Sequence, residues 1–242
     1  MKDNAMKPSR IPASRRRARS QGGWEILQFG LYAMFMVPLF LFTFINGMNL
    51  LRMIQIIQIC RDLGNEYIHG VDFSTYEAQN VSARLAQGYG LQIGNSFTSN
   101  GTTCTTSNCA TNDGNSGNGY VVLSEVLYVG NGVCSSLPAG TTCTNQNKYV
   151  FMQRLDFGNK SLQINGVTVA SALGNPSATI NSSGWVQNYI TDSGAVAPNF
   201  GNFWQTQFTD GQVAYVVETF FSSPDLSFSA YPGGGIYSRT FF

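Results

Sequence analysis

The run Leu31-Tyr-Ala-Met-Phe-Met-Val-Pro-Leu-Phe-Leu-Phe-Thr-Phe-Ile45 lies inside 26 consecutive uncharged residues, which separate Glu25 from Arg52. As an α-helix, that uncharged segment measures about 39 Å, whereas the hydrocarbon core of a bilayer is about 30 Å thick. Trp24, just before it, is a residue type favoured at the membrane interface. The apolar character also continues beyond Arg52, so we expect one membrane helix over residues 24–62.

The residues before this helix form a basic arm. Seven of the 14 Lys and Arg residues fall in the first 19 positions, where only Asp3 opposes them. Because basic flanks stay on the cytoplasmic side, the arm over residues 1–23 predicts a cytoplasmic N-terminus. A cleaved secretory signal has a shorter apolar core than this one. We therefore expect an uncleaved membrane anchor, with residues 63–242 outside the cytoplasm.

Two local signals refine the helical part. Pro38 lies inside the span and removes a backbone donor, so we expect it to kink the membrane helix. Ser74-Thr-Tyr-Glu77 has the form of a capping box, which predicts a second helix from about residue 75 to 87. In that helix, Tyr76, Val81 and Leu85 would lie near one face.

The remainder of the chain has the composition of loops and strands. In residues 95–119, 20 of 25 positions are Gly, Ser, Thr or Asn. Asn165-Gly166 predicts a tight hairpin turn inside one later run. Runs rich in β-branched or aromatic residues predict strands at Tyr120–Val129, Tyr149–Phe157, Leu162–Ala170, Val186–Thr191, Val213–Phe221, Leu226–Tyr231 and Ile236–Phe242. The fold class that we expect is α+β: a long N-terminal membrane helix, a short helix and an antiparallel β-sheet ectodomain.

Four cysteines, Cys104, Cys109, Cys134 and Cys143, lie in this polar part of the chain. Their position outside the cytoplasm favours disulfides over free thiols, and four cysteines allow three pairings. The pairs 104–109 and 134–143 would each close a short loop. The repeated Gly-Thr-Thr-Cys-Thr at 101–105 and 140–144 equally fits a 104–143 link. Cys60 is left over at the end of the membrane helix.

Composition excludes several function classes. Charged residues are 11% of the chain and the net charge is +1, which excludes a strongly charged disordered protein and gives no basic face for nucleic acid. With a single His, a His-rich metal site cannot be built in one chain. The segment 112–119 fails the calcium-loop pattern. Nucleotide and hydrolase fingerprints are absent from the sequence, so we expect no cofactor.

Two acids interrupt apolar strand faces. Glu125 and Glu218 could form a general acid/base pair. More often, such residues face solvent or pair with an Arg, and Arg154 and Arg239 lie on neighbouring predicted strands. We therefore expect no enzymatic activity. His69 is interpreted as a surface residue.

Glu25 is the only acid between Asp3 and Asp62. It could sit at the water boundary near the positive end of the helix, or it could pair with a positive charge of another subunit. The arm, Gly22, Gly23, Glu25 and the apolar helix together resemble the layout of type IV prepilins. In that class a Glu at the fifth mature position is thought to neutralise a neighbour's N-terminal amine.

More specifically, the chain resembles TadE-like minor pilins or pseudopilins of the tight-adherence system. The segment Phe29–Phe42 is similar to that family's Phe-Ala-Leu-x-x-Pro-Leu membrane motif. The ending Ile236–Phe242 is similar to its Tyr-x-Arg-x-x-Phe pattern. If Glu25 is the fifth mature residue, the resemblance implies a prepilin peptidase cut between Ser20 and Gln21. Gly22 or Gly23 at the cut would put Glu25 third or second.

The resemblance implies a function in assembly of a tight-adherence-type pilus or secretion apparatus. Its partners would be other pilin or pseudopilin subunits, which would contact it through the membrane helix, the prepilin peptidase and membrane lipid, with no nucleic acid. One alternative is an anchored surface-binding module, adhesin or lectin-like, using aromatic residues near Trp185 and Trp204. A second is an anchored hydrolase using Glu125 and Glu218, or a Ser with Lys148 or Lys160.

Overall fold

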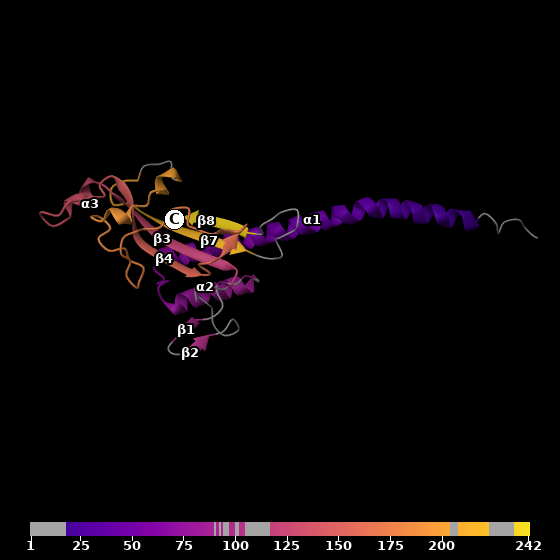
Figure 1. Cartoon of the computed structure of the whole chain (residues 1–242), viewed down its shortest axis with the longest axis horizontal. Helices are drawn as coiled ribbons and strands as arrows, with labels where there is room; N and C mark the ends of the chain where they lie inside the picture. The colour runs from indigo at the N-terminus through magenta and orange to yellow at the C-terminus, as the bar shows by residue number, and fades with distance from the viewer. Residues whose placement is uncertain are drawn as a thin grey trace, which may run out of the picture. The chain divides into compact units, whose positions relative to one another are not determined.

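The computed structural model describes residues 18–89, 91, 93, 97–99, 102–104, 117–203, 208–222 and 235–242. Backbone contacts divide the chain into two units, Met1–Leu50 and Leu51–Phe242, which are described separately. The helices are α1 (Ala18–Ile68), α2 (Tyr76–Gly88), α3 (Asn131–Ser135) and the 3-10 turns η2 (Ser193–Ala195) and η3 (Phe200–Asn202). The strands are β1 (Phe97–Ser99), β2 (Thr102–Cys104), β3 (Gly119–Val129), β4 (Lys148–Gly158), β5 (Gln163–Ile164), β6 (Val167–Thr168), β7 (Val213–Ser222) and β8 (Gly235–Phe241). The expected α+β class is confirmed (Figure 1).

The second unit is built on a four-stranded antiparallel sheet in the order β4-β3-β7-β8. The consecutive strands β3 and β4 are neighbours in the sheet. The next strand of this sheet, β7, pairs with the other edge of β3, so the connection from β4 to β7 passes over β3. Two-stranded hairpins β1-β2 and β5-β6 complete the described strands, and the predicted turn Asn165-Gly166 joins β5 to β6. Asn165 has φ 56° and Gly166 has φ 74°, the conformation that an Asn-Gly turn requires.

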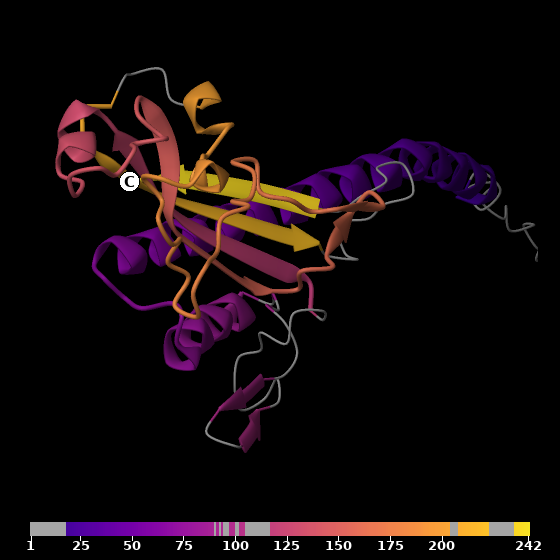
Figure 2. The ribbon, with the colours of Figure 1, turned by 60° about the vertical axis from the view of Figure 1, so that its left-hand side comes forward.

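One face of the sheet is covered by helices. Within this unit, the turns of α1 from Leu51 to Ile68 pack an apolar stripe on the sheet, and α2 packs beside them (Figure 2). The stripe recurs every three to four residues, which is the period of one helix face. Its buried members are Ile56, Ile59, Cys60, Leu63 and Tyr67, in one cluster with Val121, Leu123, Phe157, Val217 and Phe221 of the strands.

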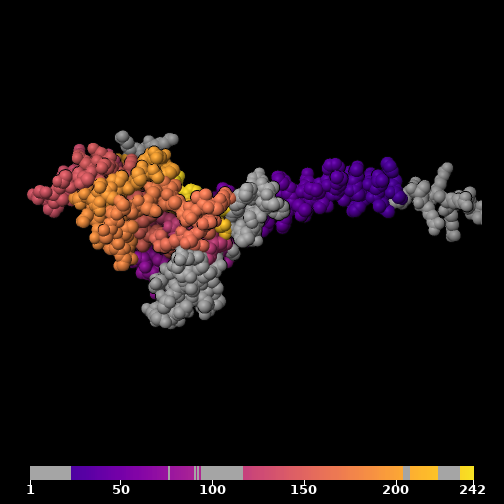
Figure 3. All heavy atoms as spheres, in the orientation of Figure 1, coloured from indigo at the N-terminus to yellow at the C-terminus, as the bar shows by residue number. Residues whose placement is uncertain are grey.

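The opposite face is covered by the long segment between β4 and β7. Side chains of this segment, drawn in salmon to orange, spread over the unit in the view of Figure 3. Leu162 contacts Val122 and Phe220, while Leu173 and Phe200 join Val126 and Val216 in a second cluster. The sheet is therefore buried on both faces, which explains why its strands have nearly continuous apolar runs.

The expected N-cap of the second helix and one of the expected strands were wrong. The N-cap of α2 is Thr75, whose hydroxyl accepts a hydrogen bond from the amide of Ala78, and not Ser74. The buried face of α2 is made of small residues around Ala83, whereas Val81 is 55% exposed. The segment 186–191 is not a strand, because it makes one isolated bridge, Ile180 with Val186, and otherwise turns. The predicted strand at 226–231 lies outside the described residues.

Asp210 fixes the connection at the far end of β3. Its carboxylate accepts from the backbone amides of Gly130, Gly132 and Val133, at the start of α3. A Cβ on either glycine would lie within 3.0 Å of this carboxylate, so the small residues allow the approach. The carboxylate thus satisfies amides that the start of a short helix leaves without partners.

We predict that Asp210→Ala lowers the free energy of unfolding by about 1–3 kcal/mol, because three amides lose a charged acceptor. The measurement is urea unfolding of the full chain in detergent, followed by circular dichroism. Asp210→Asn keeps one oxygen acceptor and should lose about half as much. Equal stability of the Ala variant and the parent would contradict this role.

Candidate functional site

The first unit presents an apolar helical surface. α1 contains one segment long and apolar enough to cross a membrane, by length and composition alone. From Trp24 to Leu50 its large apolar side chains are exposed around the whole circumference, Phe29 at 74% and Phe40 at 68% among them. A helix that is apolar on every side is suited to lipid or to other apolar helices. The membrane expectation is supported at this coarse level.

The candidate processing and pairing residues lie in the first turns of α1. The helix begins at Ala18, so Ser20, Gln21, Gly22 and Gly23 are all helical. Glu25 lies two turns inside, and its side chain is exposed. Glu25 therefore lies beyond the first turn of α1, in which the effect of a helix N-terminus on a carboxylate is strongest.

Pro38 lies in the middle of α1 without ending it. Its missing N–H leaves the carbonyl of Met34 without its helical donor. One turn later, the Thr43 hydroxyl donates to the carbonyl of Leu39 at 2.8 Å, and the Asn46 amide donates to that of Phe42 at 2.7 Å. Both polar side chains therefore form hydrogen bonds with backbone carbonyls of their own helix. The kink at Pro38 stays a prediction.

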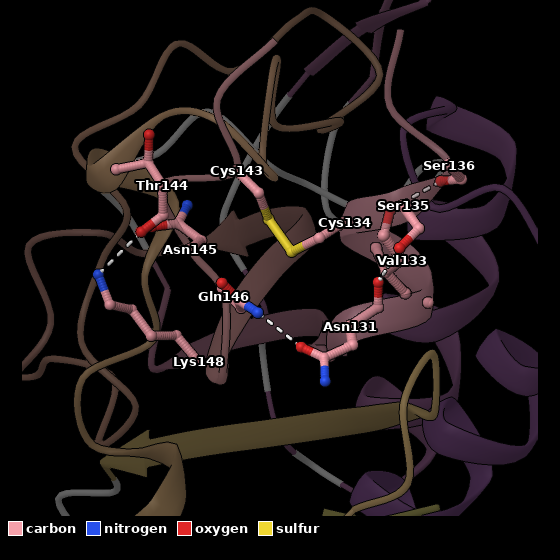
Figure 4. The surroundings of a disulfide bond; sticks show 12 residues. Asn131, Val133, Cys134, Ser135, Ser136, Cys143, Thr144, Asn145, Gln146 and Lys148 are labelled. Carbon is pink, nitrogen blue, oxygen red and sulfur yellow. Dashed lines mark hydrogen bonds between the residues drawn. A yellow bond between two sulfur atoms is a disulfide. The ribbon is translucent and has the colours of Figure 1, made fainter. Parts of the chain in front are cut away.

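The structure contains one of the disulfides that the sequence left open. Cys134 of α3 is bonded to Cys143 in the loop leading to β4, with Cα atoms 5.5 Å apart (Figure 4). Beside it, the Gln146 amide donates to the side-chain oxygen of Asn131 at 2.5 Å. The bond and this contact both join the two ends of the β3-β4 connection. Cys104 lies in β2 but its side chain, like Cys109, is outside the described residues, and Cys60 is a buried free thiol.

The two carboxylates weighed as an acid/base pair lie on opposite faces of the sheet. Glu125 pairs in register with Tyr215, and Glu218 pairs with Val122. Successive strand residues point to opposite faces, so Glu125 faces the helices and Glu218 faces the long segment. They cannot act on one substrate.

Glu218 is fully buried and hydrogen-bonded on the segment side. It accepts from the hydroxyls of Ser171 and Tyr237 and from the amide of Ala172. This carboxylate raises the pKa of the Tyr237 hydroxyl, after burial as the first cause. These bonds hold the start of the long segment on the sheet. Because both oxygens of Glu218 accept hydrogen bonds from the protein, we interpret this carboxylate as structural.

Arg154 is the main buried cation on the same face. It is 7% exposed, and its guanidinium donates to Ser124 Oγ at 2.5 Å and to Asn175 Oδ1 at 2.8 Å. Burial lowers the pKa of this guanidinium, and the charges of Glu218 and Asp156 act in the opposite direction. Arg154 borders a pocket of about 430 Å³, and two of its five N–H donors bind protein oxygens.

Glu125 is the buried acid whose charge has no cation beside it among the residues described. It is 7% exposed, and burial raises the pKa of its carboxyl, while a hydrogen bond from Tyr215 lowers it. Sequence reasoning singled out Glu125 because it interrupts an apolar strand. Its neighbours Tyr67 and Gln153 were missed, because they come from a helix end and another strand.

The remaining candidates have ordinary environments. His69 is exposed and its Nδ1 lies 2.6 Å from the carbonyl of Asn65, so the surface interpretation is confirmed. Lys160 pairs with Asp156 on the surface, and Lys148 donates to the carbonyl of Thr144. Trp185 is 42% exposed. Trp204 and most of segment 112–119 lie outside the described residues.

No family model, no curated protein and no solved structure matches this chain.

We predict that the double variant Cys134→Ala, Cys143→Ala has a free energy of unfolding about 2–3 kcal/mol lower than that of the parent. The reason is that the bond closes a loop between residues nine apart in sequence, and its loss frees the unfolded chain. Thermal unfolding with and without reductant measures the effect, and reductant should shift only the parent. Peptide mapping without reduction that found Cys134 bonded to another cysteine would contradict the pairing.

We also predict that Glu125→Gln stabilises the protein at neutral pH. A carboxyl whose pKa is raised on folding binds protons more strongly in the folded state, so stability falls as pH rises from about 4.5 through the raised pKa. The neutral amide removes this loss, so the variant should melt higher than the parent at pH 7.5 and match it near pH 4. A melting-temperature difference that does not change with pH would contradict the assignment.

Proposed function

We propose that this chain is a non-enzymatic, single-span protein of a bacterial inner membrane, a TadE-like minor pilin or pseudopilin. The observation that carries the proposal is the two-part character of α1. Its turns up to Leu50 expose apolar side chains on every side, whereas its turns from Leu51 onward form the core of a sheet domain. One helix thus supplies both an apolar surface for a bilayer and the central element of a folded head.

The proposed orientation follows from charge and sulfur chemistry. The basic arm favours a cytoplasmic N-terminus, and the bond between Cys134 and Cys143 requires an oxidising compartment in most bacteria. Both arguments support a position of the sheet domain in the periplasm or at the surface. The two arguments are independent, since one uses the first 19 residues and the other uses a loop of the head.

The proposed partners are further pilin-class helices. Inside a bilayer, helices gain no hydrophobic energy by associating, so packing and rare polar groups provide the attraction. Thr43 and Asn46 are hydrogen-bonded within their own helix. Glu25 is the only acid between Asp3 and Asp62. An ionised carboxylate costs up to about 3 kcal/mol if it is drawn to mid-bilayer, and less near the interface. A neighbour's N-terminal amine would neutralise it, which gives the residue a direct function in assembly.

We predict that Glu25→Gln leaves membrane insertion and folding unchanged but lowers recovery in sheared filaments, or in complexes with other pilin-class subunits, by at least about tenfold. The expected cost is that of losing a charged hydrogen-bond partner in a low-dielectric setting. The measurement is quantitative immunoblotting of membrane and filament fractions in cells that also make the cognate peptidase. N-terminal sequencing of the same material locates any cut near residues 20–23.

Gln28→Ala is the matched control, because Gln28 lies one turn further on the same exposed helix surface and carries no charge. It should assemble like the parent. An intact Met1 together with no recovered pilin-class partner would contradict the proposal, as would normal assembly of the Glu25→Gln variant.

A further inference from the structure

A pocket of about 370 Å³ lies on the helix-covered side of the sheet domain, where the end of α1 meets the strands. It is formed by three strands, the helix end, the turn after it and the loop that precedes Val186. The residues that matter are Tyr67, Asp72, Glu125, Gln153, Trp185 and Tyr215. None of them has a part in the proposed pilin function.

The floor of the pocket is polar and almost completely buried. Tyr67, Glu125 and Gln153 are 5%, 7% and 7% exposed. The Tyr67 hydroxyl donates to Gln153 Oε1 at 2.8 Å, and Gln153 Nε2 donates to the carbonyl of Ser183 at 2.9 Å. The Tyr215 hydroxyl donates to Glu125. Each tyrosine hydroxyl has one proton to donate, and both protons are already in hydrogen bonds. The hydrogen-bonding groups that remain for a ligand are therefore mostly acceptors, the oxygens of the carboxylates.

The lining is also unbalanced in charge. Its described residues include two carboxylates, Glu125 in the floor and Asp72 at the rim, and no Lys, Arg or His. A buried carboxylate without a cation is costly in the folded protein. A ligand that brings a positive charge and donors would offset this cost, whereas a ligand rich in acceptors would not.

An aromatic surface stands at the entrance. Trp185 exposes 42% of its surface, and its backbone is held in place because its amide donates to Asn181 Oδ1 and it bridges to Gln153 of β4. An indole face attracts an organic cation more strongly than a phenyl or phenol ring does. The rings of Tyr67 and Tyr215, which also line the pocket, stand at 89° to each other.

We propose that this pocket binds a small organic ammonium group, with the cation on Glu125 and its alkyl groups against Trp185. Choline represents this class of ligand. This proposal does not depend on the pilin proposal, because the two use different residues and are tested by different experiments.

The test is isothermal titration of choline into the full chain, in a polyoxyethylene detergent that carries neither ammonium nor sugar groups, at constant ionic strength. The neutral isostere 3,3-dimethyl-1-butanol should bind at least about tenfold more weakly, since it lacks only the charge. Glu125→Gln should lose the same factor, and Trp185→Leu about fivefold. Asp156→Asn, a carboxylate-to-amide change elsewhere on β4, is the control and should bind like the parent.

Choline binding by the parent should also weaken as pH falls from 7.5 toward 5, because protonation of Glu125 removes the charge. Melting temperatures show that each variant is folded, and Trp185→Leu tests the site separately if Glu125→Gln does not fold. Equal binding of choline and its neutral isostere would overturn the proposal. So would binding of glucose in place of choline, which would make the pocket a sugar site.

Discussion

The packing of one helical stripe on one sheet face holds the head of this protein together. Ile56, Ile59 and Leu63 are completely buried against β3 and β7, and the Cys60 thiol donates to the carbonyl of Val217. α2 packs in the same cluster, with small residues facing inward. The polar pocket at the end of α1 exists because Tyr67, the last member of the stripe, reaches Gln153 across the sheet edge.

α1 has to satisfy two surroundings with one backbone. Before Leu50 the sequence has no apolar period, and exposed side chains surround the helix. After Arg52 the buried residues recur every three to four positions, and the residues between them are exposed or partly exposed. A change in periodicity, and not a break in the helix, marks where the surroundings change from apolar on all sides to a core on one side.

Much of this architecture was predictable from local pattern. The strands at 120–129, 149–157, 213–221 and 236–242 were located to within two residues, because a sheet buried on both faces needs continuous β-branched and aromatic runs. The segment 186–191 has a similar composition but covers an edge of the sheet as a loop. Its apolar residues are used for packing, so composition alone could not distinguish it from a strand.

The site was less predictable, because it depends on register and long-range order. Whether Glu125 and Glu218 share a face depends on how β3 pairs with β7, nearly 100 residues later in the chain. Likewise, the choice of Cys143 as the partner of Cys134 depends on where α3 and the β4 loop come together. The capping-box pattern predicted Ser74 as the N-cap of α2. In the structure the amide of Ser74 donates to the Asp72 carboxylate in a turn, and Thr75 is the N-cap.

The position of β8 has a consequence for how the protein is made. The hydroxyl of Thr240 donates to the Cys60 sulfur, across a sequence separation of 180 residues. At a synthesis rate of about 5–20 residues per second, Cys60 leaves the ribosome roughly 10–40 s before Thr240 does. During that interval Ile56 and Leu63 have no finished sheet to cover them. The buried stripe of α1 is therefore among the first parts of the head to be made, and the two strands β7 and β8 that complete its cover are among the last.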